Sequence, residues 1–249
     1  MGFHSLVDHT HKLVILWNLG VGHTHLFRLI HEAVTGQTLF NVYSLLDPMH
    51  PDGHVYHEDL ETVKGLKDYA IIGIIRDPWS RLTAIYEEFV LRLKAHAMLD
   101  IKYKFVNGVN FPFQDVVKLG ALLQREVLAP IVEAQVAEEY PEGTRFVTLD
   151  KCYKPLKDAL EEGGASTSSL ASLEALTSRA LKSTSKSLSR SFIGHVPPTN
   201  LALAHLPPYR AFYSNELWDI VSESYGADLA KWPELNQTFS KGSEPKEVL

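Results

Sequence analysis

Two short runs of apolar residues stand out along the chain and predict buried strands. They cover residues 12–17 (Lys-Leu-Val-Ile-Leu-Trp) and 70–75 (Ala-Ile-Ile-Gly-Ile-Ile). Continuous apolar runs of this length are typical of strands that are covered on both faces. Residues 144–149 (Thr-Arg-Phe-Val-Thr-Leu) predict another strand. We expect these segments to belong to one sheet.

Between and after the strands, apolar residues recur at helical spacing. The predicted helices cover residues 23–33, 58–68, 79–92, 113–123, 125–139, 153–162 and 215–225. Strands that alternate with helices predict an α/β fold, in which a parallel sheet carries helices on both faces.

A length of 249 residues suits one large α/β domain or two small ones. We predict a single domain over residues 1–236, followed by a polar, disordered tail over residues 237–249. Residues 165–191 are rich in serine and threonine, with basic residues between them. This composition favours a flexible linker, and the alternative is a mobile lid whose basic residues face an anionic ligand.

The overall composition limits the classes of function. The formal charge of −6 and the pI near 6.0 argue against a general nucleic-acid binder, which would carry an excess of basic residues. The N-terminal residues lack the layout of a signal peptide, and no apolar run reaches the roughly 18 residues that span a bilayer. Cys152 is the only cysteine, which excludes an intrachain disulfide and favours a reducing compartment. We expect a soluble, cytoplasmic protein without a membrane partner.

The junction between the second strand and the helix after it carries candidate chemistry. Residues Arg76–Leu82 read Arg-Asp-Pro-Trp-Ser-Arg-Leu, so an arginine stands where the strand ends and a proline begins the helix. Such a corner presents a cation and backbone N–H groups to an anion. The alternative is a structural arginine that caps the strand or pairs with Asp77. We expect Asp77 to cap the helix, and for Arg81 we favour a structural role over a ligand contact.

A second candidate loop follows the first strand. Residues Gly20–Thr24 read Gly-Val-Gly-His-Thr and precede a predicted helix, a layout in which glycines let the backbone approach a phosphate. The loop lacks the Gly-Lys-Ser/Thr ending of a Walker A motif and the third glycine of a dinucleotide motif. A plain strand-to-helix turn is the alternative. Taken with Arg76, the loop indicates a nucleotide that carries phosphates at both ends.

The order of these motifs resembles that of sulfotransferases that use 3′-phosphoadenosine 5′-phosphosulfate, in their carbohydrate-type (sulfotransferase family 2-like) branch. Residues Arg76–Tyr86 resemble the branch's Arg-Asp-Pro-x-x-Arg-Leu-x-Ser-x-Tyr, which binds the 3′-phosphate. Residues Leu19–Thr24 fall where the family has Pro-Lys-x-Gly-x-Thr, which binds the 5′-phosphosulfate. The resemblance implies a P-loop-like fold and the following donor-binding residues: Gly20, Gly22, His23, Thr24, His25, Arg76 and Thr83.

Later segments support the resemblance, which covers most of the chain. Residues 146–150 and 155–160 are similar to the family's later strand and helix. Residues 195–200 resemble its His-x-Asn-like stretch, and residues 217–229 resemble its closing Val-x-x-x-Tyr-x-x-Asp pattern.

Two positions depart from the family pattern. Ala84 stands where the family has a serine at the 3′-phosphate, which makes Thr83 the candidate hydroxyl. Gly20 stands where the family has the lysine that neutralises the leaving phosphate. The loss of a preorganised cation where charge develops costs several kcal/mol of transition-state stabilisation. His23, His25 or a basic residue of the segment 179–190 is the candidate substitute.

The sequence also offers candidates for a catalytic base. Sulfuryl transfer needs a group that takes the proton of the acceptor hydroxyl, and histidine suits this because its pKa lies near neutral pH. The candidates are His54, His57 and Glu58, which lie between the two nucleotide loops in the sequence. The alternatives are ordinary surface histidines or a metal site at these residues, which lack a His-Glu-x-x-His motif. We expect no metal. Trp17 and Trp79 suit core packing or stacking on adenine, and we favour the core.

These inferences predict a sulfotransferase. It would move a sulfuryl group from 3′-phosphoadenosine 5′-phosphosulfate to a hydroxyl, or to an amine, of a small-molecule or glycan acceptor, releasing adenosine 3′,5′-bisphosphate. The alternatives are a nucleotide-binding homologue that has lost catalysis and a P-loop kinase, which the missing Walker lysine disfavours. The acceptor and the oligomeric state stay open.

Overall fold

A computed structural model of the chain describes residues 4–18, 21, 26, 30–32, 60, 63–87, 112–122, 135, 139–166, 168–171, 192–197, 201 and 208–236. The chain divides into two compact units. Unit 1 comprises Met1–Ile75 and Ala137–Ser185, and unit 2 comprises Arg76–Val136 and Lys186–Leu249. Each unit is therefore assembled from two distant segments of the sequence. The single domain over residues 1–236 stays a prediction.

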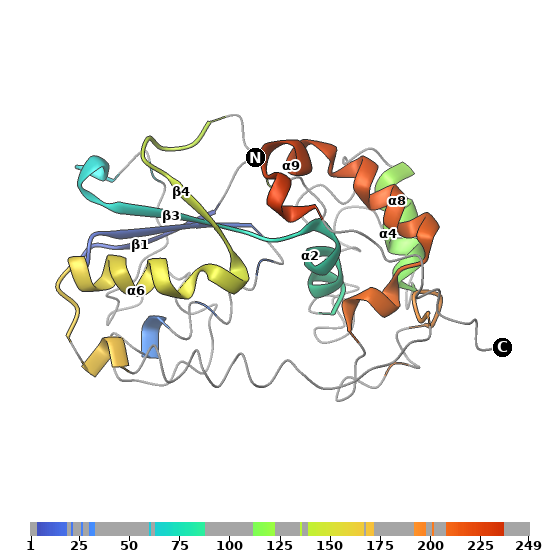
Figure 1. The fold of residues 1–249 in the computed structure, drawn as a ribbon, viewed down its shortest axis with the longest axis horizontal. Coiled ribbons are helices and arrows are strands. Elements are labelled where there is room, and N and C mark those ends of the chain that lie inside the picture. Colours follow the sequence, from blue (N-terminus) through green and yellow to red (C-terminus); the bar gives the residue numbers. More distant parts are fainter. Residues whose placement is uncertain are drawn as a thin grey trace, which may run out of the picture. The chain divides into compact units, whose positions relative to one another are not determined.

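Unit 1 is built on a sheet that has, among the described residues, four strands in the order β1-β2-β3-β4 (Figure 1). β1 (His4–Asp8) pairs with β2 (Leu13–Trp17) in antiparallel orientation, and β3 (Ala70–Ile75) and β4 (Arg145–Thr148) continue the sheet in parallel. The three predicted strands are confirmed to within one residue at each end. The prediction of a purely parallel sheet is wrong, because β1 makes the sheet mixed.

Asp8 stabilises the turn that returns the chain from β1 to β2. Its carboxylate oxygen Oδ1 accepts hydrogen bonds from the backbone N–H groups of Thr10 (2.9 Å) and His11 (3.1 Å). Lys12, the last residue of the turn, has a positive φ of 52°. An aspartate that bonds the backbone two residues further on favours such a tight turn, and a tight turn joins strands in antiparallel orientation.

Both faces of the sheet are covered. One core cluster contains residues of β2, β3 and helix α6 (Tyr153–Glu162): Leu13, Ile15, Ile72, Ile74, Leu156, Ala159 and Leu160. The other contains residues of the strands and of the segment before β3: Val7, Val14, Leu16, Val63, Tyr69 and Ile71. Alternate residues of a strand point to opposite faces, so a run that is apolar throughout is buried on both. The α/β character predicted from these runs is confirmed.

The predicted helix over residues 58–68 is wrong where the structure describes it. Gly65 has a positive φ of 70°, Leu66–Asp68 form a short 3-10 helix, η3, and Leu60 is also in 3-10 conformation, but Val63–Gly65 between them are not helical. Glycine enters the left-handed region without a steric penalty, so it can end a helical run that the apolar spacing alone would continue. Apart from Leu60, residues 58–62 lie outside the described residues.

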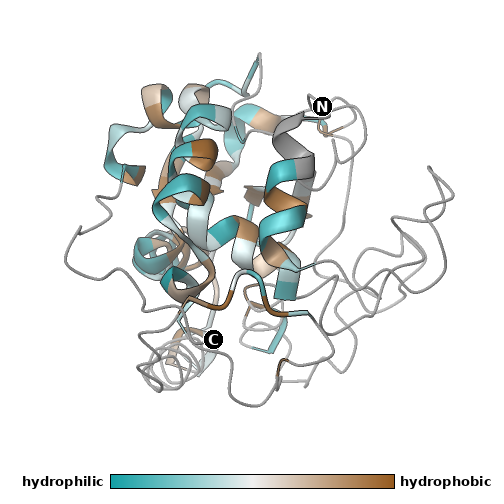
Figure 2. Ribbon diagram, turned by 90° about the vertical axis from the view of Figure 1, so that its right-hand side faces the viewer, coloured by the Kyte–Doolittle hydropathy of each residue, from teal (hydrophilic) through white to brown (hydrophobic). Residues whose placement is uncertain are grey.

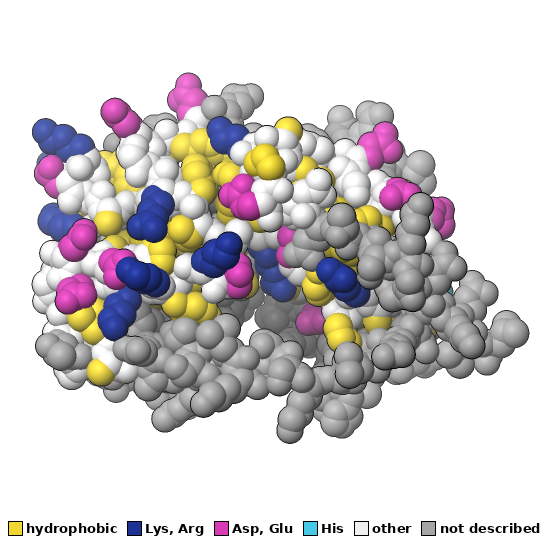
Figure 3. All heavy atoms as spheres, in the orientation of Figure 1, with side chains coloured by type: hydrophobic (Ala, Val, Ile, Leu, Met, Phe, Trp, Pro, Cys, Tyr) yellow, Lys and Arg dark blue, Asp and Glu magenta, His cyan; other side chains and the backbone are white. Residues whose placement is uncertain are grey.

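Helix α6 has the predicted range and ends at the predicted glycines. Gly164 has a φ of 87°, and the N–H of Ala165 donates to the carbonyl of Leu160 (2.9 Å), which closes the helix end. Basic (Lys, Arg) and acidic side chains lie next to one another on the face shown in Figure 3. On α6, Lys154 pairs with Asp158 (2.7 Å). In the segment predicted as a flexible linker or lid, Leu170 is buried in the core of unit 1, while Ser166, Ser168 and Ala171 are exposed. Residues 167 and 172–191 lie outside the described part.

The secondary-structure elements that the structure describes in unit 2 are helices. Its elements are α2 (Pro78–Ile85), α4 (Phe113–Leu122), η8 (Tyr209–Phe212), α8 (Asn215–Ser224), α9 (Gly226–Lys231) and η9 (Pro233–Leu235). Hydrophobic and hydrophilic residues alternate around the helices in Figure 2, as expected for helices with one buried side. None of the helices in the described part of the chain is long and apolar enough to cross a membrane.

Some of the predicted helices are confirmed by the structure, and others lie mostly outside the described residues. Those over residues 113–123 and 215–225 are confirmed by α4 and α8, and the one over 79–92 is confirmed as far as Ile85. Of the range 125–139, the structure describes only Gln135 and Glu139, and neither is helical. Of the range 23–33 in unit 1, the four described residues are helical.

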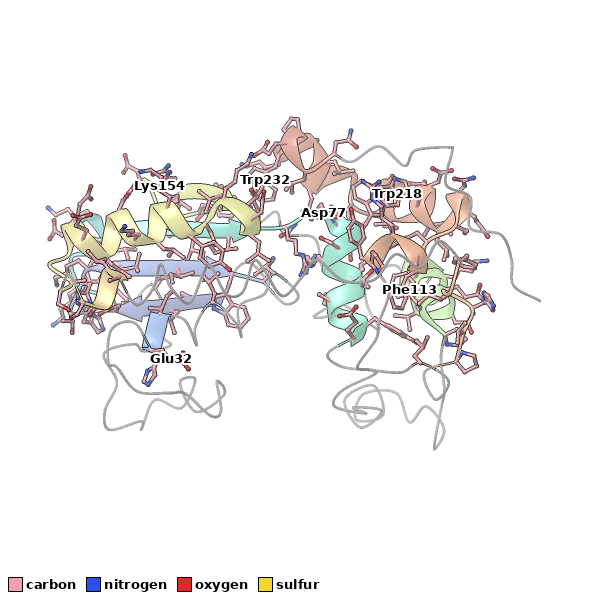
Figure 4. The ribbon with its side chains drawn as sticks, turned by 60° about the horizontal axis from the view of Figure 1, so that its bottom comes forward. Glu32, Asp77, Phe113, Lys154, Trp218 and Trp232 are labelled. Carbon is pink, nitrogen blue, oxygen red and sulfur yellow. The ribbon has the colours of Figure 1, made fainter. Side chains whose placement is uncertain are left out.

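Aromatic rings form the centre of unit 2. Trp79 of α2 stacks on Trp218 of α8 with ring centroids 4.3 Å apart, and its indole N–H donates to the carbonyl of Trp218 (3.2 Å). Phe113 of α4 meets the ring of Tyr213 edge to face at 5.0 Å. Figure 4 labels Phe113 and Trp218 on their helices. The core position predicted for Trp79 is confirmed, and so is that of Trp17, which is 3% exposed in unit 1.

Candidate functional site

Asp77 begins the helix that follows β3. Its Oδ1 accepts a hydrogen bond from the backbone N–H of Ser80 (2.9 Å), and Pro78 occupies the first helical position, which needs no N–H partner (Figure 4). The predicted cap is therefore confirmed. A proline after a capping aspartate fixes the chain direction at this corner, so the backbone of Arg76, one residue before the cap, has a defined place.

The side chain of Arg76 is oriented by the same turn. Its Nε donates to Oγ of Ser80 (2.9 Å), and that hydroxyl donates in turn to Oδ2 of Asp77. The partial burial of the guanidinium lowers the pKa of Arg76, while the negative charges of Asp77 and Glu87 raise it. An arginine keeps its proton at physiological pH under such a shift. The corner therefore holds a fixed positive charge on a hydrogen-bonded support.

A second arginine lies in the element that packs against α2. The 3-10 helix η8 carries Tyr209 and Arg210, and Nε of Arg210 lies 3.4 Å from the Tyr209 hydroxyl. Burial raises the pKa of Tyr209, and the charges of Arg210 and Arg76 act in the opposite direction. The sequence gives no signal for this placement, because η8 follows α2 by more than a hundred residues. Arg210 and Tyr209 thus add to the electrostatic surroundings of Arg76.

The side chains of Arg81 and Thr83 are buried in unit 2. Arg81 is 1% exposed, and its guanidinium carbon lies 5.9 Å from the ring centre of Tyr225. This supports the structural role favoured for it. Thr83 is also 1% exposed, and its hydroxyl donates to the carbonyl of Trp79 (3.1 Å). In this conformation the hydroxyl is used inside its own helix, and the donor contact predicted for Thr83 stays a prediction.

The loop after β2 is described in part. The N–H of Val21 donates to the carbonyl of Asn18 (3.3 Å), so the chain turns directly after the strand, and Val21 is buried. This confirms the predicted turn. The parallel pairing of β2 with β3 brings their carboxyl ends to the same edge of the sheet. The predicted ligand residues of this loop lie outside the described residues: Gly20, Gly22, His23, Thr24 and His25.

The candidate bases His54, His57 and Glu58 also lie outside the described residues. His195, in the stretch that resembles a later family motif, is exposed, and its ring lies 5.3 Å from that of Phe192. Within the described ranges, no three His, Cys, Asp or Glu side chains gather as they would around a metal ion.

Cys152 does not provide a nucleophile. It directly follows η5 (Leu149–Lys151), its side chain is buried in unit 1, and Sγ donates to the carbonyl of Leu149 (3.0 Å). Burial raises the pKa of Cys152 to about 12. Because the thiolate is the reactive form, Cys152 is unreactive as a nucleophile at neutral pH.

Comparisons with known proteins found no match: no protein-family model, curated protein or solved structure is significantly similar to the chain.

Proposed function

We propose that the protein is a sulfotransferase whose donor is 3′-phosphoadenosine 5′-phosphosulfate and that Arg76 binds the 3′-phosphate. The loop Gly20–Thr24 would bind the 5′ end of the donor, as the sequence motif implies. The acceptor would be a hydroxyl, or an amine, of a small molecule or a glycan. We further propose that the sheet and its helices are arranged as in P-loop-like folds.

The observation that carries the proposal is the construction of the Arg76 corner. A permanent cation is held by Ser80 and Asp77 at the first turn of a helix that begins directly after a buried strand. A guanidinium with a fixed orientation binds phosphate through paired N–H groups, and a helix N-terminus adds positive potential. Arg210 and Tyr209, from the element packed on α2, supply further polar groups in the same unit.

The chemistry follows from the donor. The acceptor oxygen attacks sulfur, the bond from sulfur to the 5′-phosphate oxygen breaks, and adenosine 3′,5′-bisphosphate leaves. A base takes the proton of the acceptor, the role proposed for His57, with His54 and Glu58 as alternatives. Gly20 supplies no cation for the leaving phosphate, which leaves that role to His23, His25 or a basic residue of the segment 179–190.

Calorimetry with three nucleotides tests the donor class. We expect adenosine 3′,5′-bisphosphate to bind more tightly than adenosine 5′-monophosphate and ATP. Arg76→Ala should weaken binding of the bisphosphate by about 10- to 100-fold, the range for one charge-assisted contact, and leave the monophosphate within about twofold. Lys118→Ala is the matched control, because Lys118 pairs with Glu216 on the surface of unit 2. Equal affinity for all three nucleotides, or a preference for ATP, would refute the proposal.

A second candidate, a binding protein without transferase activity, is favoured by the glycine at position 20. Turnover of the donor with a panel of hydroxyl and amine acceptors separates the two. Bisphosphate binding without sulfuryl transfer to any acceptor would select the binding protein.

A further inference from the structure

A buried glutamine holds the backbone of Arg76 after the chain leaves the sheet. Oε1 of Gln135 accepts from the N–H of Arg76 (2.9 Å), and Nε2 of Gln135 donates to the carbonyl of Arg76 (2.6 Å). Arg76 follows the last residue of β3 directly, so these two backbone groups lie outside the strand ladder. A buried backbone N–H or carbonyl without a partner is costly, and this one side chain provides a partner for both.

Asp228 anchors the glutamine in turn. Oδ2 of Asp228, in α9, accepts from the backbone N–H of Gln135 (3.0 Å) and lies 3.4 Å from its Nε2. Gln135 and Asp228 are both 0% exposed. The three residues are separated by 59 and 93 positions in the sequence, so the contacts join three distant segments of unit 2.

The chemistry of the network requires an amide at position 135. The N–H of Arg76 needs an acceptor, whereas its carbonyl and the carboxylate of Asp228 need donors. The amide of glutamine meets all three with its oxygen on one side and its NH2 group on the other. Turning the amide over would direct its oxygen at the carbonyl and the carboxylate, so the network itself fixes its orientation. A glutamate would lack the donors, and an alanine would leave the backbone groups of Arg76 unpaired.

Arg76 is thus held at two points. Gln135 holds the backbone, and Ser80, bonded to Asp77, holds the guanidinium. We propose that Gln135 and Asp228 are positioning residues for the phosphate contact of Arg76, so that preference for a 3′-phosphorylated nucleotide depends on two buried side chains that touch no ligand. The inference rests on the proposed function for the identity of the ligand. We call the hydrogen bonds that join Arg76, Gln135 and Asp228 the clamp, and their existence does not depend on the proposed function.

The first experiment measures the clamp without any ligand. In the full-length protein, Gln135→Met removes the amide at similar volume, and we expect hydrogen exchange of the Arg76 amide to become about tenfold faster, as for an amide that has lost its acceptor. Gln114→Met, at a half-buried position on α4, is the control. It should leave this exchange rate unchanged. An unchanged rate in folded Gln135→Met overturns the clamp, whatever the nucleotide results are.

The second experiment measures the consequence for binding. The ratio of the affinities for adenosine 3′,5′-bisphosphate and adenosine 5′-monophosphate should fall about tenfold in Gln135→Met, while affinity for the monophosphate stays within about twofold. A merely structural role would lower both affinities together or neither. In the Arg76→Ala background the same substitution should have no further effect on the ratio. If Gln135→Met does not fold, Asp228→Asn, which keeps the shape of the anchor, should shift exchange and ratio in the same direction.

The outcomes separate the two proposals. A wild-type protein that does not prefer the bisphosphate refutes the proposed function, and the exchange experiment still decides the clamp. A wild-type protein that prefers it, together with a folded Gln135→Met that keeps the full preference, overturns the positioning role alone.

Discussion

The two units use different interactions to fill their cores. Unit 1 buries aliphatic side chains on both faces of a sheet, and one face is completed by α6. Unit 2 buries a cluster that is rich in tryptophan, tyrosine and phenylalanine. Both units also bury polar side chains, among them Asp8 in unit 1 and Arg81, Gln135 and Asp228 in unit 2. Aliphatic burial is not directional, whereas ring stacking and buried hydrogen bonds depend on geometry.

The difference shows which unit depends more on contacts whose strength varies with geometry. Arg76 is the first residue of unit 2, and its contacts are directional hydrogen bonds with Ser80 and Gln135. The part of the candidate site around Arg76, which belongs to unit 2, therefore depends on directional contacts. We expect substitutions in the aliphatic core of unit 1 to change stability, and substitutions around Arg76 in unit 2 to change stability together with nucleotide binding.

The largest effect is expected from Trp79→Ala. Trp79 is 1% exposed, stacks on Trp218 and donates a hydrogen bond to the carbonyl of that residue. Removing a buried tryptophan costs about 3–5 kcal/mol of the free energy of unfolding, measured by urea denaturation followed by circular dichroism. Ile15→Val, in the core of unit 1, is the aliphatic control and should cost about 1 kcal/mol. Equal costs for the two substitutions would break the comparison.

A smaller effect is expected where backbones approach closely in unit 1. A Cβ atom on Gly163 would lie 2.1 Å from the carbonyl oxygen of His11, which belongs to the backbone and cannot rotate away. Gly163→Ala should therefore lower the free energy of unfolding by about 2–3 kcal/mol, the upper part of the range for overpacking. Gly226→Ala is the matched control, because a Cβ there meets no atom within 4 Å. A loss in the control as large as that at Gly163 would contradict the steric explanation.

The smallest effect is a slope of stability with pH. Burial raises the pKa of Cys152 from 9.0 to about 12, so the folded state keeps a proton that the unfolded state releases above pH 9. The contribution is complete below pH 9 and is lost as the pH rises to 12, at about 1.4 kcal/mol per pH unit. Comparing the urea midpoints of wild type and Cys152→Ala between pH 8 and pH 10.5 isolates this slope. Parallel pH profiles would show that Cys152 does not contribute.

The centre of the fold can be predicted from the sequence because apolar runs report burial directly. β2 and β3 are each covered on two faces, whereas β4 is only partly buried, and α6 ends at two glycines that mark it in the sequence. β1 was not predicted: its sequence His-Ser-Leu-Val-Asp contains no long apolar run, and its pairing depends on the turn at Asp8. The helix over residues 58–68 failed because Gly65 takes a left-handed conformation, which a count of apolar positions does not detect.

The candidate site also contains residues that the sequence predicts and residues that it does not. The role of Asp77 follows from its place before a proline, and that motif pointed to Arg76 as well. Gln135 carries no such signal, and Asp228 was marked only as the aspartate of the closing Val-x-x-x-Tyr-x-x-Asp pattern, without a role. A glutamine that bonds a backbone 59 residues away looks like any surface glutamine in the sequence, and only the folded chain brings the two segments together. Local patterns thus identify the charged group, while its supports are long-range contacts.

The alternation of the two units along the chain has a consequence for biosynthesis. The chain crosses from one unit to the other after Ile75, after Val136 and after Ser185. During synthesis, β1, β2 and β3 are made before β4 and α6, so the sheet of unit 1 cannot be completed until those later elements are made. In the same way, α2 is made before α8, with which it shares a core cluster. Neither unit can finish folding as a separate N-terminal domain on the ribosome, so truncations that remove either half leave exposed apolar surface in both units.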